Sequence, residues 1–197
     1  MNKLRYVFIA VGVALLIGAI GLTVYNMWDD ARAQKSAENV LAELEKKIPD
    51  SVDGTPDYKL NPDMEMPTEK IDGEEYIGTL SIPTLGLELP VMSEWNYDRL
   101  MIAPCRYTGS VYKNNMIIAA HNYTHHFGRL KKLSIGDPIK FKDVDGNIFE
   151  YSVTALEILQ PTAVDEMEKD NQGLTLFTCT IGGRTRVTVR CEAVNQK

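Results

Sequence analysis

The stretch TLFTCTIGGRTRVTVRCE, residues 175–192, gives the clearest view of the fold and raises the question of function. Two alternating apolar and polar runs flank the pair Gly182-Gly183, which predicts a β-hairpin with a two-residue turn. This register places Cys179 opposite Arg186. Directly opposed side chains share one face, about 4.5–5.5 Å apart at Cβ. The sequence therefore predicts a guanidinium beside a thiol.

Cys179 could be a buried filler, half of a disulfide, a metal ligand or a nucleophile. A disulfide with Cys191 does not fit the register, and the three cysteines are an odd number. No C-x-x-C spacing suggests zinc. A cation beside a thiol favours the nucleophilic thiolate. Cys191 has the opposite parity to Arg186 and is interpreted as a small core residue, whereas Cys105 could be buried or exposed.

Acyl transfer by a thiolate also needs a proton donor and donors for the oxyanion. The chain has three histidines, and His121 ends the apolar run 116–121, where a strand can aim its side chain. His125 and His126 lie in a polar stretch that is typical of a loop. Spacing alone leaves two interpretations of His121 open, a catalytic residue and an ordinary strand-end histidine.

Three arginines follow the glycine pair, and the hairpin register separates them. Arg186 faces Cys179, Arg184 lies at the turn, and Arg190 lies four positions further along the strand. At roughly 3.3 Å per residue, Arg190 is about 13 Å away along the strand. Arg186 is therefore predicted to act with Cys179. A longer turn would make Arg184 the rival.

Composition and charge exclude some classes of protein. The chain has 197 residues and 44% hydrophobic residues, enough for one ordinary domain with extra segments. Lys3 and Arg5 are the only charges in the first 28 residues and contribute +2. The net charge of the whole chain is −6, so the remainder carries −8. That balance argues against nucleic acid as a partner, because phosphate binding needs a basic surface.

Tyr6 to Tyr25 is a run of twenty residues without a charge. As a helix it spans roughly 30 Å, the hydrocarbon thickness of a bilayer. Lys3 and Arg5 precede it and the pair Asp29-Asp30 follows, so the N-terminus is predicted to be cytoplasmic and the remainder extracellular. A cleaved signal peptide has a shorter apolar core and a small-residue cleavage site. The sequence thus predicts an uncleaved single-pass anchor in the cell membrane.

The rest of the chain divides into a spacer and a β-rich domain. Residues 29–48 have a modest helical stripe, which could contact the domain or a partner, or be part of a solvated spacer. Residues 49–75 are acidic and contain four prolines, so they are interpreted as a linker or surface wrap. From residue 76, short alternating runs follow one another, including a hairpin around Asp145-Gly146. The predicted boundaries are 1–28, 29–75 and 76–197, with the last a closed or nearly closed β-barrel.

These residues together resemble the sortases, the membrane-anchored cysteine transpeptidases of Gram-positive bacteria. Thr175 to Cys179 matches the family's TLxTC motif, His121 in IIAAH matches its histidine, and Arg186 in RVTVRC matches its arginine. The resemblance covers roughly residues 76–194 and the anchor. It implies a mainly β fold, a closed eight-stranded sortase-type barrel with short helices after one transmembrane helix.

The resemblance also implies a reaction. The enzyme, of the EC 3.4.22 type, would cleave an LPxTG-like sorting signal after its threonine and form a thioacyl intermediate on Cys179. An amine of a peptidoglycan precursor or a pilin lysine would then release the product. His121 would transfer protons, Arg186 would hold substrate and oxyanion, and Thr178 and Ala120 would shape the substrate groove. No cofactor and no metal is predicted.

The class of sortase is left open, although the sequence is more like class A, D or E. Residues 49–75 contain no Asp-Pro-aromatic lid motif, which argues against the pilin-polymerising class C. The interval 160–173 is short, which argues against class B. Two other functions stay in view. These are a non-catalytic membrane-anchored β-domain that displays a binding surface, and a cysteine peptidase that transfers the acyl group to water.

Overall fold

The computed structural model describes residues 2–50, 52, 54–168 and 173–194. The chain separates into two compact units, Met1–Arg32 and Ala33–Lys197. Helix α1 (Asn2–Glu45) begins in the first unit and ends in the second. Among the described residues, one helix, Leu4–Glu45, is long and apolar enough to cross a membrane. This helix fits the predicted single-pass anchor.

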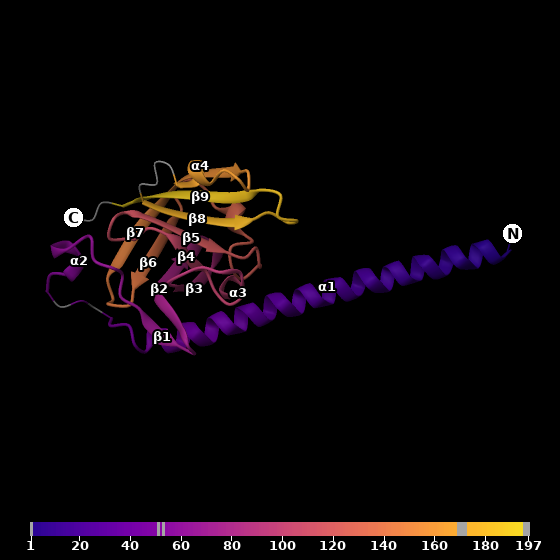
Figure 1. Ribbon diagram of the computed structural model, residues 1–197, viewed down its shortest axis with the longest axis horizontal. Helices are drawn as coiled ribbons and strands as arrows, with labels where there is room; N and C mark the ends of the chain where they lie inside the picture. The colour runs from indigo at the N-terminus through magenta and orange to yellow at the C-terminus, as the bar shows by residue number, and fades with distance from the viewer. Residues whose placement is uncertain (1, 51, 53, 169–172, 195–197) are drawn as a thin grey trace. The chain divides into compact units, whose positions relative to one another are not determined.

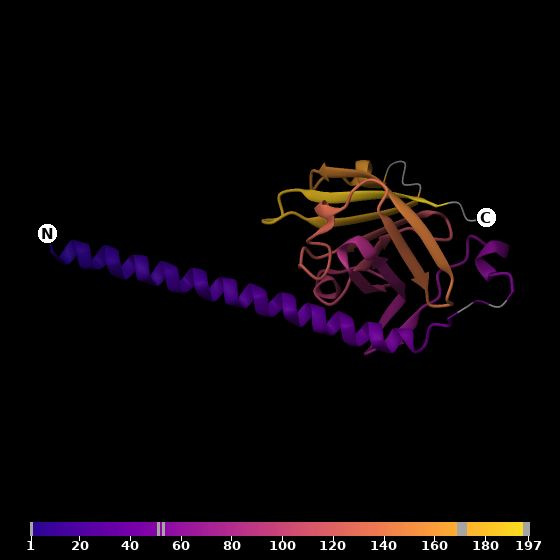
Figure 2. The same ribbon diagram turned by 180° about the vertical axis from the view of Figure 1, so that it is seen from behind.

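The second unit contains a closed β-barrel, seen from two sides in Figures 1 and 2. Its strands pair in the order β2-β3-β4-β5-β8-β9-β7-β6, and β6 pairs back with β2 to close the ring. A short additional strand, β1, pairs with β2 outside the ring. The eight-stranded barrel predicted from the sequence is therefore confirmed. The strands are β1 (Glu69–Ile71), β2 (Glu74–Ile82), β3 (Leu87–Met92), β4 (Cys105–Thr108), β5 (Asn115–Ala120), β6 (Pro138–Asp143), β7 (Ile148–Leu159), β8 (Gly173–Cys179) and β9 (Arg186–Ala193).

Helical segments in the connections are short. They are α2 (Asp57–Leu60), η1 (Pro83–Leu85), α3 (Tyr97–Leu100), η2 (Leu130–Lys132) and α4 (Val164–Glu168). Helix α3 follows β3, and α4 lies in the connection from β7 to β8. These two helices matter for function, because both contribute to the pocket described below.

Alternation along the strands sorts side chains between the barrel interior and its outer face. On β8, Leu174 and Leu176 belong to the main core, whereas Phe177 and Cys179 are half-buried on the opposite face. On β9, the core residues are Val187, Val189 and Cys191, and the arginines take the alternate positions. This period of two is the pattern from which the hairpin was predicted.

The predicted turn at Asp145-Gly146 joins β6 to β7 around a buried carboxylate. Asp143 Oδ1 accepts the amide protons of Asp145 and Asn147, at 3.1 and 2.8 Å. Its Oδ2 accepts from Tyr112 Oη and Asn147 Nδ2, both at 2.8 Å. Because every partner is a donor, the charge is satisfied in the interior. Burial, with Asp143 beside the ring, raises the pKa of Tyr112.

The stripe predicted within residues 29–48 contacts the domain. Val40, Leu44 and Ile48 are buried in a second apolar cluster with residues of the barrel's outer face, including Tyr76 and Met92. The solvated-spacer alternative is therefore wrong for this face of the helix. The sequence could not decide between a packed helix and a solvated spacer. Four apolar residues at helical spacing do not specify which surface they contact.

Residues 54–75 pack against the domain, which agrees with the surface-wrap interpretation of this segment. Met66 is 4% exposed and belongs to the main core, and Ile71 of β1 lies in the second cluster. The ring of Tyr58 stacks on Tyr112 at a centroid distance of 4.8 Å. A few apolar side chains thus attach an otherwise polar segment to the barrel.

Candidate active site

Three adjacent strands bring the predicted site residues to one end of the barrel. Strand β5 pairs with β8 in parallel, and β8 pairs with β9 in antiparallel orientation. Ala120, the last residue of β5, pairs with Thr178, so His121 and Cys179 occupy the next step of the parallel register. Arg186, the first residue of β9, pairs with Cys179. Topology therefore juxtaposes the histidine, the cysteine and the arginine.

The predicted pairing of Cys179 with Arg186 is confirmed, but the turn differs in detail. Thr180 O accepts the amide of Gly183 at 2.8 Å, so Ile181 and Gly182 form the corner rather than the two glycines. The Thr180 amide still donates to Thr185 O at 3.0 Å, which preserves the register below the turn. Gly182 and Gly183 both have positive φ, 80° and 71°, the conformation for which glycine is suited.

Cys179 differs from the other two cysteines in exposure. All three are free, but Cys105 and Cys191 are buried and Cys179 is half-buried. Burial raises the pKa of Cys105 and of Cys191 to about 12. The core position predicted for Cys191 is confirmed, and Cys105, which the sequence left open, is a core residue of β4. Cys179 is the one thiol placed for chemistry with a substrate.

His121 is half-buried, and its ring lies 4.8 Å from the ring of Tyr123 at an interplanar angle of 32°. Its carbonyl accepts the amide of Phe127 at 3.2 Å, which ties the strand end to the following loop. His126 is fully buried, and His125 lines a small cavity with Gln34 and Glu38 of α1. Of the three histidines, His121 is the one at the strand end next to Cys179.

The Thr178 hydroxyl links the strand ends that carry these two residues. Its Oγ1 donates to Ala120 O at 2.8 Å, and the side chain is 3% exposed. Thr178 points away from the face that carries Cys179 and does not line the adjacent pocket. The substrate contact predicted for Thr178 stays a prediction, and its observed contact is with the backbone of β5.

A pocket of about 210 Å³ adjoins Cys179. Ala120, Cys179 and Arg186 line it, as does Phe177. Its walls come from the connection between β7 and β8, and from α3 with the aromatic residues around it. These wall residues are Pro161, Ala163, Val164 and Met167 on one side and Trp95, Tyr97, Leu100 and Tyr107 on the other. An apolar pocket ending at a thiol and a guanidinium suits an extended peptide with apolar side chains.

Comparison with known proteins agrees with this geometry. A family model described as "Sortase domain" matches residues 80–194. The chain belongs to the sortase family. Sortase A of Bacillus anthracis is 30% identical over 194 residues, which cover 91% of this chain and 89% of that protein. Sortases are cysteine transpeptidases, so an accessible cysteine at the end of a TLxTC strand fits the family.

Solved sortase structures share the fold. A sortase D5 transpeptidase of Clostridium perfringens superposes with a TM-score of 0.62, at 23% identity, covering 82% of this chain and 99% of that one. Sortase A from Corynebacterium diphtheriae gives a TM-score of 0.57 at 20% identity, covering 85% of each chain. At these identities the likeness establishes the barrel architecture.

Arg186 of this sortase is held over its own hairpin. Its Nη1 donates to Gly183 O at 3.1 Å and to Thr185 O at 3.2 Å, which leaves the rest of the guanidinium beside the pocket. Arg184 is exposed and does not line the pocket. The structure therefore supports the choice of Arg186 over Arg184 as the neighbour of the thiol.

Arg190 has a different task, which the sequence did not reveal. Its Nε donates to Glu157 Oε2 at 3.2 Å, and its Nη atoms donate to the carbonyls of Met167 and Glu166 at 2.6 and 2.7 Å. A weaker bond of 3.4 Å reaches Thr175 Oγ1. Because α4 carries a pocket wall, Arg190 fixes that wall to the barrel. Backbone acceptors leave no signal in a sequence, so this contact could be found only in the fold.

Within the described ranges, no group of three or more His, Cys, Asp or Glu residues is arranged to hold a metal ion. Glu94 lies in the loop between β3 and α3, and its nearest ionic partner is Arg99, at 3.5 Å.

Proposed function

We propose that this sortase cleaves an LPxTG-like sorting signal through a thioacyl intermediate on Cys179 and transfers the acyl group to an amine. The observation that carries the proposal is the pairing of Cys179 with Arg186 at the end of an apolar pocket, with His121 at the adjacent strand end. Nucleophile, proton-transfer group and oxyanion donor are the three elements that acyl transfer requires.

In the first step the Cys179 sulfur attacks the threonine carbonyl carbon. The peptide C–N bond breaks, and His121 gives a proton to the departing amine. In the second step an acceptor amine attacks the thioester carbon, His121 takes up the amine proton, and the thiolate leaves. Arg186 donates hydrogen bonds to the oxygen that gains negative charge in both tetrahedral states.

The pocket supports an apolar peptide on the acyl side of the scissile bond. Val164 and Met167 form one wall, and the β5 alanines, Ala119 and Ala120, have side chains small enough to let a substrate backbone approach. A leucine and a proline fit such a surface, because burial of apolar area is the main source of binding free energy there. The substrate role predicted for Ala120 is part of this proposal, and Thr178 positions the strand ends.

The acceptor is an amine of a peptidoglycan precursor or of a pilin lysine. We propose that the reaction takes place at the membrane, with the catalytic domain outside the cell. The support for this orientation is the sequence asymmetry, Lys3 and Arg5 before the apolar run and Asp29 and Asp30 after it.

Mass spectrometry of the full-length protein in detergent tests the proposal. The protein is mixed with LPxTG-like peptides, and an adduct is expected on the tryptic peptide that contains Cys179. Adding an amine such as triglycine converts the adduct to a transpeptidation product, whereas a peptidase gives the same hydrolysed product with or without amine. A binding domain without catalysis forms no adduct with any peptide.

A further inference from the structure

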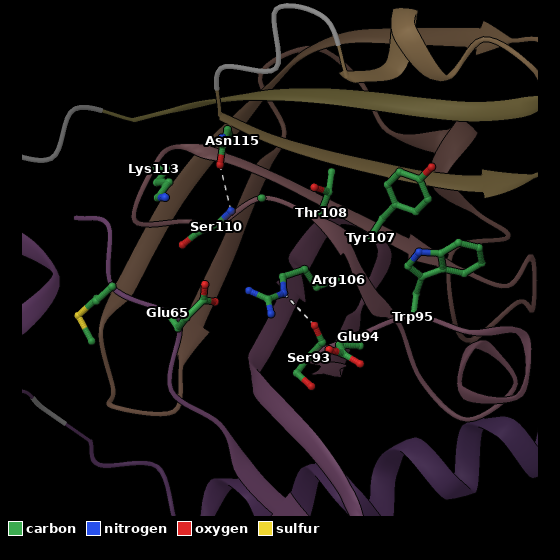
Figure 3. Close-up of a pocket in the computed structure, with 12 residues that line it drawn as sticks. Glu65, Ser93, Glu94, Trp95, Arg106, Tyr107, Thr108, Ser110, Lys113 and Asn115 are labelled. Atoms are coloured by element: carbon green, nitrogen blue, oxygen red, sulfur yellow. Dashed lines mark hydrogen bonds between the residues drawn. The ribbon is translucent and has the colours of Figure 1, made fainter. Parts of the chain in front are cut away.

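A second and larger pocket, of about 610 Å³, lies beside the first and shares two of its residues. Trp95 and Tyr107 line both, so the two pockets adjoin at these side chains. Figure 3 shows the second pocket with Arg106 directed into it. Its lining is mainly polar, in contrast to the apolar pocket at Cys179.

Arg106 is the distinctive charge of this second pocket. Its Nε donates to Ser93 O at 2.8 Å, which fixes the guanidinium. In the part of the chain that the structure describes, no carboxylate pairs with it. The pocket's other cation, Lys113, is paired with Asp63 at 3.1 Å, and Glu94 is paired with Arg99 at 3.5 Å. A half-buried, pre-positioned guanidinium without an acid suits an acidic ligand group.

The strand register gives the separation of Arg106 from the nucleophile. Arg106 pairs with Ile118 on β5, and the ladder continues to His121 and Cys179 at its end. Three residue steps along the sheet are about 10 Å, and two strand spacings across it are also about 10 Å. The Cα atoms of Arg106 and Cys179 are therefore about 14 Å apart by this geometry.

An extended peptide advances about 3.4 Å per residue. With the threonine carbonyl of LPxT at Cys179, the leucine lies about 10 Å away and the residue before it about 14 Å away. Trp95 and Tyr107 stand where the peptide would pass from the first pocket to the second. The leaving group, and the amine that replaces it, extend from Cys179 in the opposite direction.

We infer that the second pocket binds the segment of the substrate protein immediately before the sorting motif, and that Arg106 selects an acidic residue next to the leucine. The inference rests on the proposed function, because that function sets the direction of the peptide. Glu65 lines the same pocket from the wrapping segment and opposes an acidic side chain there. At this substrate position Arg106 thus favours an acidic side chain, whereas Glu65 disfavours one.

The test uses peptides X-Leu-Pro-Ala-Thr-Gly, with X as Asp, Ala or Lys, and the full-length protein in detergent. The readout is the ratio of kcat/KM for the Asp peptide to that for the Lys peptide, which is insensitive to the fraction of folded enzyme. We expect a ratio of about ten or more for the natural protein, since a charge-assisted bond is typically worth that much. Arg106→Glu should invert the ratio, and Glu65→Gln should increase it.

Lys131→Ala is the matched control, because Lys131 is exposed and lies outside both pockets. It should leave the ratio unchanged. A ratio that is the same in the natural protein and in Arg106→Glu overturns the inference. The inference is also overturned if Arg106→Glu changes only the dependence of the rate on amine concentration. That result would assign the pocket to the acceptor amine.

A binding measurement separates this inference from the proposed function. Fluorescence anisotropy with labelled Asp and Lys peptides is measured on Cys179→Ala, with and without Arg106→Glu. Tighter binding of the Asp peptide that Arg106→Glu reverses supports the pocket even if no peptide is cleaved. Equal binding of the two peptides to Cys179→Ala overturns the inference even if cleavage occurs.

Discussion

The Thr178 hydroxyl donates a hydrogen bond of 2.8 Å to the carbonyl oxygen of Ala120. The bond joins β8 to β5 one residue before Cys179 on one strand and one residue before His121 on the other. It is buried, so water does not compete for either partner. The spacing of nucleophile and histidine therefore depends on a buried hydrogen bond between the two strands that carry them.

Thr178→Val should therefore lower turnover while leaving the barrel folded. Valine keeps the shape but loses the donor, and we expect about 1 kcal/mol less stability. A strand end misplaced by a fraction of an ångström should lower kcat by about ten- to a hundredfold. Thr178→Ser should recover most of this loss.

Thr188→Val provides the matched control for this experiment. The Thr188 hydroxyl is buried in β9 and has no hydrogen-bond partner among the described residues, so its removal costs no bond. Chemical denaturation and peptide cleavage are measured for all three variants. An equal loss of kcat in Thr188→Val would assign the effect to general disturbance of the barrel.

Iodoacetamide should modify Cys179 alone in the folded protein at pH 8. The pKa of Cys105 and of Cys191 is raised to about 12 by burial, so both stay as buried thiols at that pH. Intact-mass measurement should show one adduct, and activity should fall in proportion to it. Cys179→Ala should take up none and be inactive, whereas two adducts on the native protein would contradict the assignment.

Arg186→Ala should lower peptide cleavage by about 10²–10³, the usual loss for an oxyanion donor. Arg186→Lys should also fail, because an ammonium does not reproduce the bonds to Gly183 and Thr185 together with a donor to the oxyanion. Arg184→Ala is the control and should stay near the natural rate. If Arg184→Ala instead loses activity on that scale, the two roles are exchanged.

Arg190→Gln should weaken substrate binding more than turnover. The variant frees α4 from the barrel, because the bonds to Glu166 O and Met167 O are lost. We expect KM to rise about tenfold, with a smaller change in kcat. Glu157→Gln removes only the charge of the side-chain partner and should have a small effect. Unchanged KM in Arg190→Gln would show that α4 is held by its other contacts.

Protease added to intact cells should remove the domain after the anchor. The expectation follows from the charges around the apolar run, Lys3 and Arg5 before it and Asp29 and Asp30 after it. Immunoblotting against an N-terminal tag should then show a short protected fragment. Protection of the whole C-terminal half would place the domain in the cytoplasm.

The sequence alone determined the barrel class, the anchor helix and the pairing of Cys179 with Arg186. Each of these rests on a local pattern, namely period-two alternation, an uncharged run of twenty residues, and glycines at a turn. The glycine pair predicted a turn centred on Gly182 and Gly183, one residue later than the observed turn. The observed turn is centred on Ile181 and Gly182, because the Gly183 amide donates to Thr180 O.

Only the tertiary structure decided what surrounds those residues. The stripe on α1 and the anchors Met66 and Ile71 become core because the barrel offers them apolar partners distant in sequence. Arg190 donates to backbone carbonyls of α4, and the second pocket brings together Trp95 of the loop after β3 with Arg106 and Tyr107 of β4. Such contacts depend on which surfaces meet in the folded chain, and no local periodicity or motif encodes that.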